Sequence, residues 1–203
     1  MIRRITYKMK VENIEILKNG GVGIIPTDTV YGIVCSAFSQ KALSRLYEIK
    51  GRDEDKPPVV LISALDDLKL FGIDPKEVTK IFTCPSEVSE RRRIKKFWPG
   101  KVSIIFNIKP ELNYLDKGRG LAIRWPADKK VLEFLKQTGP LATSSANIQG
   151  QPPAKNISEA KKYFGNNVDF YEAGGDLESL PSTLVDLRDG QVKILREGEV
   201  KIY

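Results

Sequence analysis

Short apolar runs alternate along this chain with segments of helical periodicity, and this alternation restricts the fold more than any other feature. VGIIP (22–26) and PPVVLIS (57–63) are rich in β-branched residues and predict strands. QKALSRLYEIKG (40–51) places its apolar residues at helical spacing before a glycine and predicts a helix. Two runs near the end of the chain meet around Asp189-Gly190, which is typical of an antiparallel hairpin. The pattern predicts an α/β fold in which helices pack around a mixed sheet.

The rest of the chain continues this alternation. Further strands are expected in residues 101–108, 120–126, 140–147, 168–173, 182–189 and 191–198, and further helices in 64–72, 77–97, 131–139 and 158–165. The last of these helices is expected to be capped by Ser158. Because no internal repeat or linker interrupts the sequence, we expect one domain over residues 1–203.

Composition narrows the class of protein. With 41% hydrophobic and 29% charged residues the chain is typical of a globular protein that buries a core. No apolar run approaches the roughly 18 residues of a membrane-spanning helix, and MIRRITYKMKVENI (1–14) does not have the pattern of a signal peptide. We therefore expect a cytoplasmic protein with no membrane contact.

The chain contains no histidine. Ser-His and Cys-His nucleophile pairs and His-ligated zinc are therefore excluded. Cys35 and Cys84 show no metal-ligand spacing, and Cys35, within the apolar GIVCSA, is expected to be buried. Any chemistry must use lysine, arginine, carboxylates, hydroxyls, amides or a metal that a substrate brings.

The net charge of +7 favours polyanionic partners. Six lysines and arginines gather in RRRIKKFWPGK (91–101). This stretch indicates either the solvated face of a helix or a contact with tRNA or double-stranded RNA.

Basic residues also gather where the helix of 40–51 ends, in YEIKGRDEDKPP (47–58). Lys50 and Arg52 flank a glycine, and Lys56 precedes two prolines. They are either ordinary surface charges or a binding site for an anion. The acidic residues between them, 53–55, are interpreted as a solvated loop and not as a metal site.

Two polar clusters offer hydroxyls and amides. In PTDTVYG (26–32), the alternation of Thr27, Thr29 and Tyr31 would place all three on one face if the segment is extended, as in a half-solvated edge strand, and Asp28 could cap or turn the loop. In ATSSANIQGQPP (142–153), three polar residues alternate at the end of an apolar strand: Thr143, Ser145 and Asn147. Strand ends in α/β sheets commonly bind ligands, although a turn rich in serine and asparagine gives the same pattern.

Two arginines, Arg124 in AIRWP and Arg196 in ILREGEV, lie within apolar segments. Arginine is rarely buried without a partner, so each pairs with a structural carboxylate or with an anionic substrate. Together with Lys50 and Arg52 they suit electrostatic handling of phosphate and carboxylate better than proton shuttling.

Seven motifs occur in an order that resembles the YrdC-like threonylcarbamoyl-AMP synthases, over roughly residues 10–200. They are PTDTVYG, K-x-R with Lys56-Pro57, FWPGKVSIIF, AIRWP, S-x-N at 145–147, PSTLVD and LREGEV. The resemblance implies the single-domain form of the family, with a twisted α/β sheet around a large, positively charged cavity. It implies an enzyme that condenses L-threonine, bicarbonate or CO2, and ATP to threonylcarbamoyl-AMP and pyrophosphate. Partner proteins would then transfer the product to adenosine 37 of tRNA.

The resemblance also implies residue roles. The motif positions expected at ATP are Lys50, Arg52, Lys56, Ser145, Asn147 and Arg196, of which Lys50, Arg52, Ser145 and Asn147 form the catalytic set. The positions expected at threonine are Thr29, Arg124, Thr143 and Ser182, to which the hydroxyl row adds Thr27 and Tyr31. The protein is expected to supply no metal ligand, and Mg2+ is expected to arrive with ATP.

The sequence departs from the family pattern at two places. Leu61 stands where many relatives carry a histidine that contacts threonine, and Gly150-Gln151-Pro152-Pro153 replaces a G-x-P-S type turn. Two rival functions remain open. One is a non-catalytic module for tRNA or double-stranded RNA binding or for ribosome maturation, and the other is a carbamoyl-adenylate enzyme.

Overall fold

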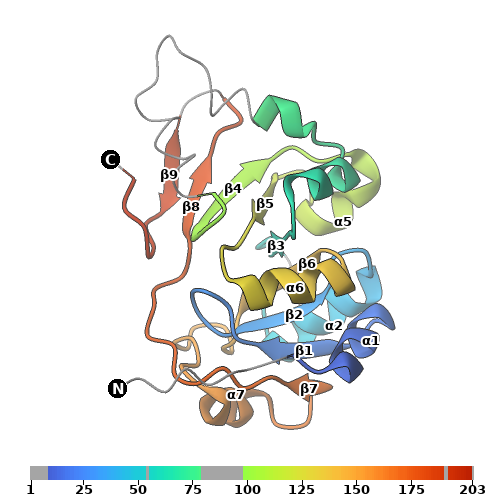
Figure 1. Ribbon diagram of the computed structural model, residues 1–203, viewed down its shortest axis with the longest axis vertical. Coiled ribbons are helices and arrows are strands. Elements are labelled where there is room, and N and C mark those ends of the chain that lie inside the picture. The colour runs from blue at the N-terminus through green and yellow to red at the C-terminus, as the bar shows by residue number, and fades with distance from the viewer. Residues whose placement is uncertain (1–8, 54, 79–97, 190–191, 203) are drawn as a thin grey trace.

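The computed structural model describes residues 9–53, 55–78, 98–189 and 192–202. Within them nine strands form one sheet in the order β7-β1-β2-β6-β3-β5-β4-β8-β9 (Figure 1). The strands are β1 Val22–Ile25, β2 Gly32–Ser36, β3 Val59–Leu61, β4 Val102–Phe106, β5 Leu121–Arg124, β6 Leu141–Ser145, β7 Phe170–Tyr171, β8 Thr183–Asp186 and β9 Lys193–Arg196. Pairs β1/β7, β3/β5 and β4/β8 are parallel and the others antiparallel, which confirms the predicted mixed sheet.

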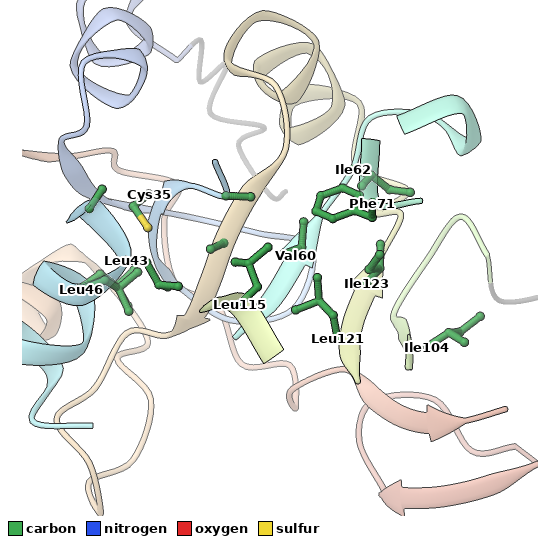
Figure 2. Close-up of a cluster of buried hydrophobic side chains, with 14 of the residues drawn as sticks. Cys35, Leu43, Leu46, Val60, Ile62, Phe71, Ile104, Leu115, Leu121 and Ile123 are labelled. Atoms are coloured by element: carbon green, nitrogen blue, oxygen red, sulfur yellow. The ribbon is translucent and has the colours of Figure 1, made fainter. Parts of the chain in front are cut away.

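Helices cover both faces of this sheet. They are α1 Val11–Lys18, α2 Gln40–Lys50, α5 Asn113–Asp116, α6 Lys129–Thr138 and α7 Ile157–Phe164, with 3-10 segments η1 Leu65–Phe71 and η2 Pro110–Leu112. On one face, α1 and α6 pack over a cluster that includes Ile25, Val34 and Leu61. On the other face, a larger cluster joins α2, η1 and α7 to the remaining strand residues, and Figure 2 shows Leu43, Cys35 and Phe71 within it.

Burial on both faces explains why several strands read as continuous apolar runs. Neighbouring residues of one strand enter opposite layers: Val34 joins the cluster below α1 and α6, whereas Ile33 and Cys35 join the other. The predicted burial of Cys35 is confirmed, and burial raises the pKa of its thiol to about 12. Cys84 lies outside the described residues.

Helix α2 follows its sequence signals closely. The Ser39 hydroxyl accepts a hydrogen bond from the Ala42 amide at the first turn. The helix ends where Gly51 adopts φ of 57°, a left-handed conformation that glycine tolerates best. This turn sends the chain in a new direction between Lys50 and Arg52.

Some predicted elements differ from the structure. Segment 64–72 forms a 3-10 helix, and the short helix α5 lies in a connection where only a turn was expected. The helix expected in 77–97 falls largely outside the described residues. The expectation that Ser158 caps α7 is wrong, because the Asn156 side chain accepts from the Glu159 amide and the helix begins at Ile157.

None of the helices within the described ranges has the length and apolar character needed to cross a bilayer.

The cap of α7 gives a direct stability test. We expect Asn156→Ala to lower the free energy of unfolding by about 1 kcal/mol, because an amide of the first turn loses its acceptor. Ser158→Ala, at an exposed position two residues later, should change it by less than about 0.5 kcal/mol. Urea denaturation of both variants measures the difference. Equal losses would contradict the assignment of the cap.

Candidate active site

A cavity of about 200 Å³ opens where the ends of several strands meet. Three arginines line it, each from a different part of the chain: Arg52 after α2, Arg124 at the end of β5, and Arg196 at the end of β9. Hydroxyls make up most of its other polar lining, from Thr27, Thr29, Thr143, Ser144, Ser145 and Ser182. Among the described residues of this lining none carries a carboxylate. The cavity is therefore suited to anions.

Arg52 is held by neutral acceptors. Its Nη1 donates to the Ser144 hydroxyl at 2.8 Å, while Nε and Nη2 donate to the carbonyls of Lys56 and Pro57, each at 3.1 Å. Burial lowers the pKa of the guanidinium from its ordinary value. The group stays charged, because even a shifted arginine titrates far above neutral pH. Asp53 acts on this charge electrostatically, but no carboxylate is hydrogen bonded to the guanidinium within the described residues.

Arg124 has a carboxylate partner. Its Nη2 lies 3.0 Å from Asp28 Oδ1, both side chains are at most 10% exposed, and its Nη1 donates to the Thr29 hydroxyl at 2.9 Å. The first of the two partners weighed from the sequence, a structural carboxylate, is therefore present. The Nε of Arg124 is buried without a hydrogen-bond partner in the described structure, so the guanidinium keeps a donor for a further acceptor.

Arg196 donates to the Ser182 carbonyl through Nη2 at 2.8 Å and Nε at 3.3 Å. No carboxylate pairs with it in the described part of the chain. Burial lowers the pKa of Arg196, and the positive charges of Arg124 and Arg52 lower it further. The three guanidinium groups are thus close enough to repel one another, and an anion bound among them would relieve that repulsion.

Lys50 does not line the cavity. The side chain is 2% exposed, and its ammonium donates to the carbonyls of Ser145 and Asn147 and to Asn147 Oδ1. The Ser145 hydroxyl donates to the same Asn147 oxygen at 2.6 Å, and the Asn147 amide donates to the carbonyls of Ile148 and Gln151. Lys50 and Asn147 therefore hold the turn after β6, and this turn presents Ser145 to the cavity.

The segment PTDTVYG forms a loop between β1 and β2 and not the extended chain that the alternation suggested. Thr27 and Thr29 lie together, 3.0 Å between hydroxyl oxygens, because Thr27 also donates to the Val30 carbonyl and folds the loop back. Tyr31 points elsewhere: its hydroxyl donates to the Gly175 carbonyl and accepts from the Gly174 amide. The expectation that all three hydroxyls share one face is wrong for Tyr31.

Some of the other predicted site residues line the cavity and others do not. Thr143 and Ser182 line the cavity, and Ser182 is hydrogen bonded to the buried Ser103 on β4. Lys56 is exposed and contributes its carbonyl to Arg52, while its ammonium does not line the cavity. Leu61 packs into the layer below α1 and α6.

Known proteins are similar to this chain in sequence and in fold. The Sua5/YciO/YrdC family model, described as telomere recombination, matches residues 15–198. The chain belongs to this family. A putative threonylcarbamoyl-AMP synthase of Mycobacterium leprae is 36% identical over 92% of this chain and 81% of its own length. A threonylcarbamoyl-AMP synthase of Klebsiella pneumoniae is 30% identical over 91% of this chain and 93% of its own.

Solved structures of the family have the same fold. P. abyssi Sua5 complexed with L-threonine gives a TM-score of 0.78 at 25% identity, over 92% of this chain and 53% of the Sua5 chain. E. coli YciO gives 0.78 at 24% identity, over 94% of this chain and 89% of its own. The chain therefore spans about half the length of Sua5 and most of the length of YciO.

Sequence reasoning missed several residues that shape this family member's cavity. Asp28 was interpreted as a cap or turn residue, yet it pairs with Arg124. Ser144 was passed over because strand alternation would place it opposite Thr143 and Ser145. Gly32 went unmarked, although a Cβ there would stand 2.6 Å from the Thr143 hydroxyl. The contacts of all three become visible only once the strands are paired.

The acidic loop of residues 53–55 and the basic stretch of residues 91–101 were also considered as binding sites from the sequence. Asp55 Oδ2 lies 3.4 Å from Arg119 Nη2. Within the described residues, no group of three or more metal-ligating side chains occurs. Residues 91–97 of the basic stretch are outside the described part, and Lys101 pairs with Glu199 at 3.0 Å. Whether 91–97 contacts RNA stays a prediction.

Lys50 is expected to make the free energy of unfolding depend on pH. Burial, with Arg52 nearby, lowers the pKa of Lys50 from 10.5 to about 7 in the folded protein. Between these values the unfolded chain binds more protons, so the stability that Lys50 contributes rises with pH. The rise approaches about 1.4 kcal/mol per pH unit at most.

We expect the difference in unfolding free energy between the wild type and Lys50→Met to shift in favour of the wild type from pH 7 to pH 9. Urea denaturation at several pH values measures it, with Lys136→Met on the exposed face of α6 as the control. A difference that does not change with pH would mean that the three oxygen acceptors keep the ammonium fully protonated.

Proposed function

We propose that this protein is a threonylcarbamoyl-AMP synthase, which condenses L-threonine, bicarbonate or CO2, and ATP to threonylcarbamoyl-AMP and pyrophosphate. The observation that carries the proposal is the cavity, where Arg52, Arg124 and Arg196 converge among hydroxyls without a carboxylate in the described lining. Relatives that bear this name, and the Sua5 structure with L-threonine, support it.

The proposed reaction needs positive charge more than it needs a base. The threonine nitrogen attacks the carbon of CO2 and loses a proton, which gives an N-carboxylate. An oxygen of this carboxylate then attacks the α-phosphorus of ATP, the bond to the β-phosphate bridge breaks, and pyrophosphate leaves. Two like unit charges 4 Å apart repel by about 1 kcal/mol in water and roughly 4 kcal/mol at an effective dielectric of 20. Cations fixed in the cavity offset this repulsion.

The positions of the three arginines favour a division of tasks. Arg52 and Arg196, whose hydrogen-bond acceptors in the described chain are all neutral, would bind the phosphates of ATP and the departing pyrophosphate. Arg124, whose Nη1 donates to Thr29 and whose Nε has no hydrogen-bond partner in the described structure, would bind the threonine carboxylate. Thr27, Thr143 and Ser182 would orient threonine from the same lining.

Other predicted residues take indirect roles in this proposal. Lys50 and Asn147 would keep Ser145 in place for the nucleotide, and Lys56 would reach ATP only from the solvent side. Mg2+ would enter as part of the substrate, bound to the ATP phosphates. Positioning and electrostatics supply most of phosphoryl-type transfer, so a site without histidine suffices.

The product would serve N6-threonylcarbamoylation of adenosine 37 in tRNA. The proposed enzyme would act in the cytoplasm, where separate proteins would complete the transfer. One domain over residues 1–203 would carry the activity.

The decisive assay is release of pyrophosphate from ATP, with the adenylate identified by mass spectrometry. We expect release to require both threonine and bicarbonate. Arg52→Ala should lower the rate at least tenfold, since removal of one fixed charge donor from such a site typically costs about 10²-fold or more. Arg45→Ala, which removes a charge from α2 outside the cavity lining, should stay within about twofold of the wild type.

The same assay separates the rivals. An RNA-binding module cannot release pyrophosphate, and a carbamoyl-adenylate enzyme would use carbamoyl phosphate in place of threonine and bicarbonate. Pyrophosphate release that does not depend on threonine, or a normal rate from Arg52→Ala, would contradict the proposal.

A further inference from the structure

We propose that Ser144 is a positioning residue that orients Arg52 toward the phosphates of ATP through a neutral hydrogen-bond acceptor. This inference rests on the proposed function, because it concerns how the same cavity binds the nucleotide. It adds a residue that lies beside, and outside, the S-x-N motif at 145–147.

The hydrogen bonds of Arg52 carry the argument. Its guanidinium has five N–H donors in one plane. One from each nitrogen is used: Nη1 to the Ser144 hydroxyl at 2.8 Å, Nε to the Lys56 carbonyl and Nη2 to the Pro57 carbonyl, both at 3.1 Å. Three acceptors fix the plane of the group, and two N–H donors remain for a ligand. A planar fork with free donors is the geometry that binds phosphate oxygens in pairs.

The chemistry of the acceptors matters as much as their number. A hydroxyl and two carbonyls orient a guanidinium without cancelling its charge, whereas a carboxylate would do both. Arg124 shows the contrast in the same cavity, since Asp28 pairs with it at 3.0 Å. Arg52 has Asp53 nearby but no hydrogen-bonded carboxylate, so its donors stay available to an anion, and its mutual repulsion with Arg196 favours an anion at that place.

The two carbonyls and the hydroxyl differ in origin. Lys56 and Pro57 belong to the loop that follows Arg52 itself, so these contacts only close a local turn. Ser144 lies on β6, 92 positions along the chain, where it pairs in register with Ile33 of β2. It is thus the side chain that ties the orientation of Arg52 to the sheet.

Ser144 and its neighbour Ser145 also have separate tasks. The Ser145 hydroxyl donates to Asn147 Oδ1 within the turn that Lys50 holds. The Ser144 hydroxyl accepts from Arg52. A change at position 144 can therefore disturb Arg52 without removing the hydrogen bonds of the S-x-N turn.

Two isosteric variants provide the test. Ser144→Thr keeps the hydroxyl and Ser144→Val replaces it by a methyl group, and both are β-branched residues that suit a strand. Calorimetric titration measures the dissociation constants of ATP, pyrophosphate and threonine separately. We expect Ser144→Val to weaken ATP and pyrophosphate binding about tenfold, the scale of one hydrogen bond to a charged group. Ser144→Thr should stay within about threefold of the wild type, and threonine binding should change less than about twofold in both.

A double-mutant cycle shows whether the effect runs through Arg52. In an Arg52→Ala background, Ser144→Val should weaken ATP binding by less than about twofold further, because the group it positions is gone. Ser44→Ala on α2, outside the cavity lining, is the control for loss of a serine hydroxyl.

Three results would overturn the inference: equal affinities of the valine and threonine variants for ATP, an undiminished effect of Ser144→Val in the Arg52→Ala background, and no binding of ATP or pyrophosphate by the wild type. The proposed function fails separately. If both anions bind with the expected dependence on Ser144 but no threonine-dependent pyrophosphate release occurs, the positioning role stands and the assigned reaction does not.

Discussion

The mutual repulsion of three guanidinium groups, of the buried Arg124, the partly buried Arg52 and the more exposed Arg196, is the constraint on which the site depends. Arg52, Arg124 and Arg196 face one cavity, and only Arg124 has a carboxylate partner within the described residues. Like charges at close range in a poorly hydrated site oppose folding. The sheet holds them together: Arg124 ends β5, Arg52 donates to the Ser144 hydroxyl on β6, and Arg196 donates to the carbonyl of Ser182, just before β8. An anion bound among the three groups would offset this repulsion, and the ATP and N-carboxylate of the proposed reaction are anions of that kind.

The two basic residues of the K-x-R motif have different surroundings. Lys50, in the last turn of α2, points into the protein, where its ammonium donates to the carbonyl and the side-chain oxygen of Asn147 in the turn after β6. Gly51 then takes a left-handed conformation, so Arg52 leaves the helix axis and enters the cavity. One glycine thus separates a lysine that organises the turn after β6 from an arginine that lines the cavity. Lys50 is bonded to Asn147 in the turn after β6, and Arg52 is bonded to Ser144 on β6.

The sequence predicts the elements of this fold better than the contacts of its site. Local chemistry predicts several elements that the structure confirms: the strands of 22–26 and 140–147, the C-terminal end of α2 at Gly51, and the hairpin around Asp189. The position of β6 between β2 and β3 does not follow, because it results from packing between distant segments. For the same reason Ser144 and Asp28 went unrecognised, Tyr31 was placed on the wrong face, and Lys50 was expected in the cavity.

The central claim is that the cavity separates its anions: phosphate at Arg52 and Arg196, carboxylate at Arg124. Calorimetric titration of ATP and of threonine against Arg196→Met and Arg124→Met tests it most directly. The account predicts that Arg196→Met loses affinity for ATP by about tenfold or more and keeps threonine binding, and that Arg124→Met shows the reverse. Equal losses for both ligands in both variants would contradict the separation and leave a single undivided anion site.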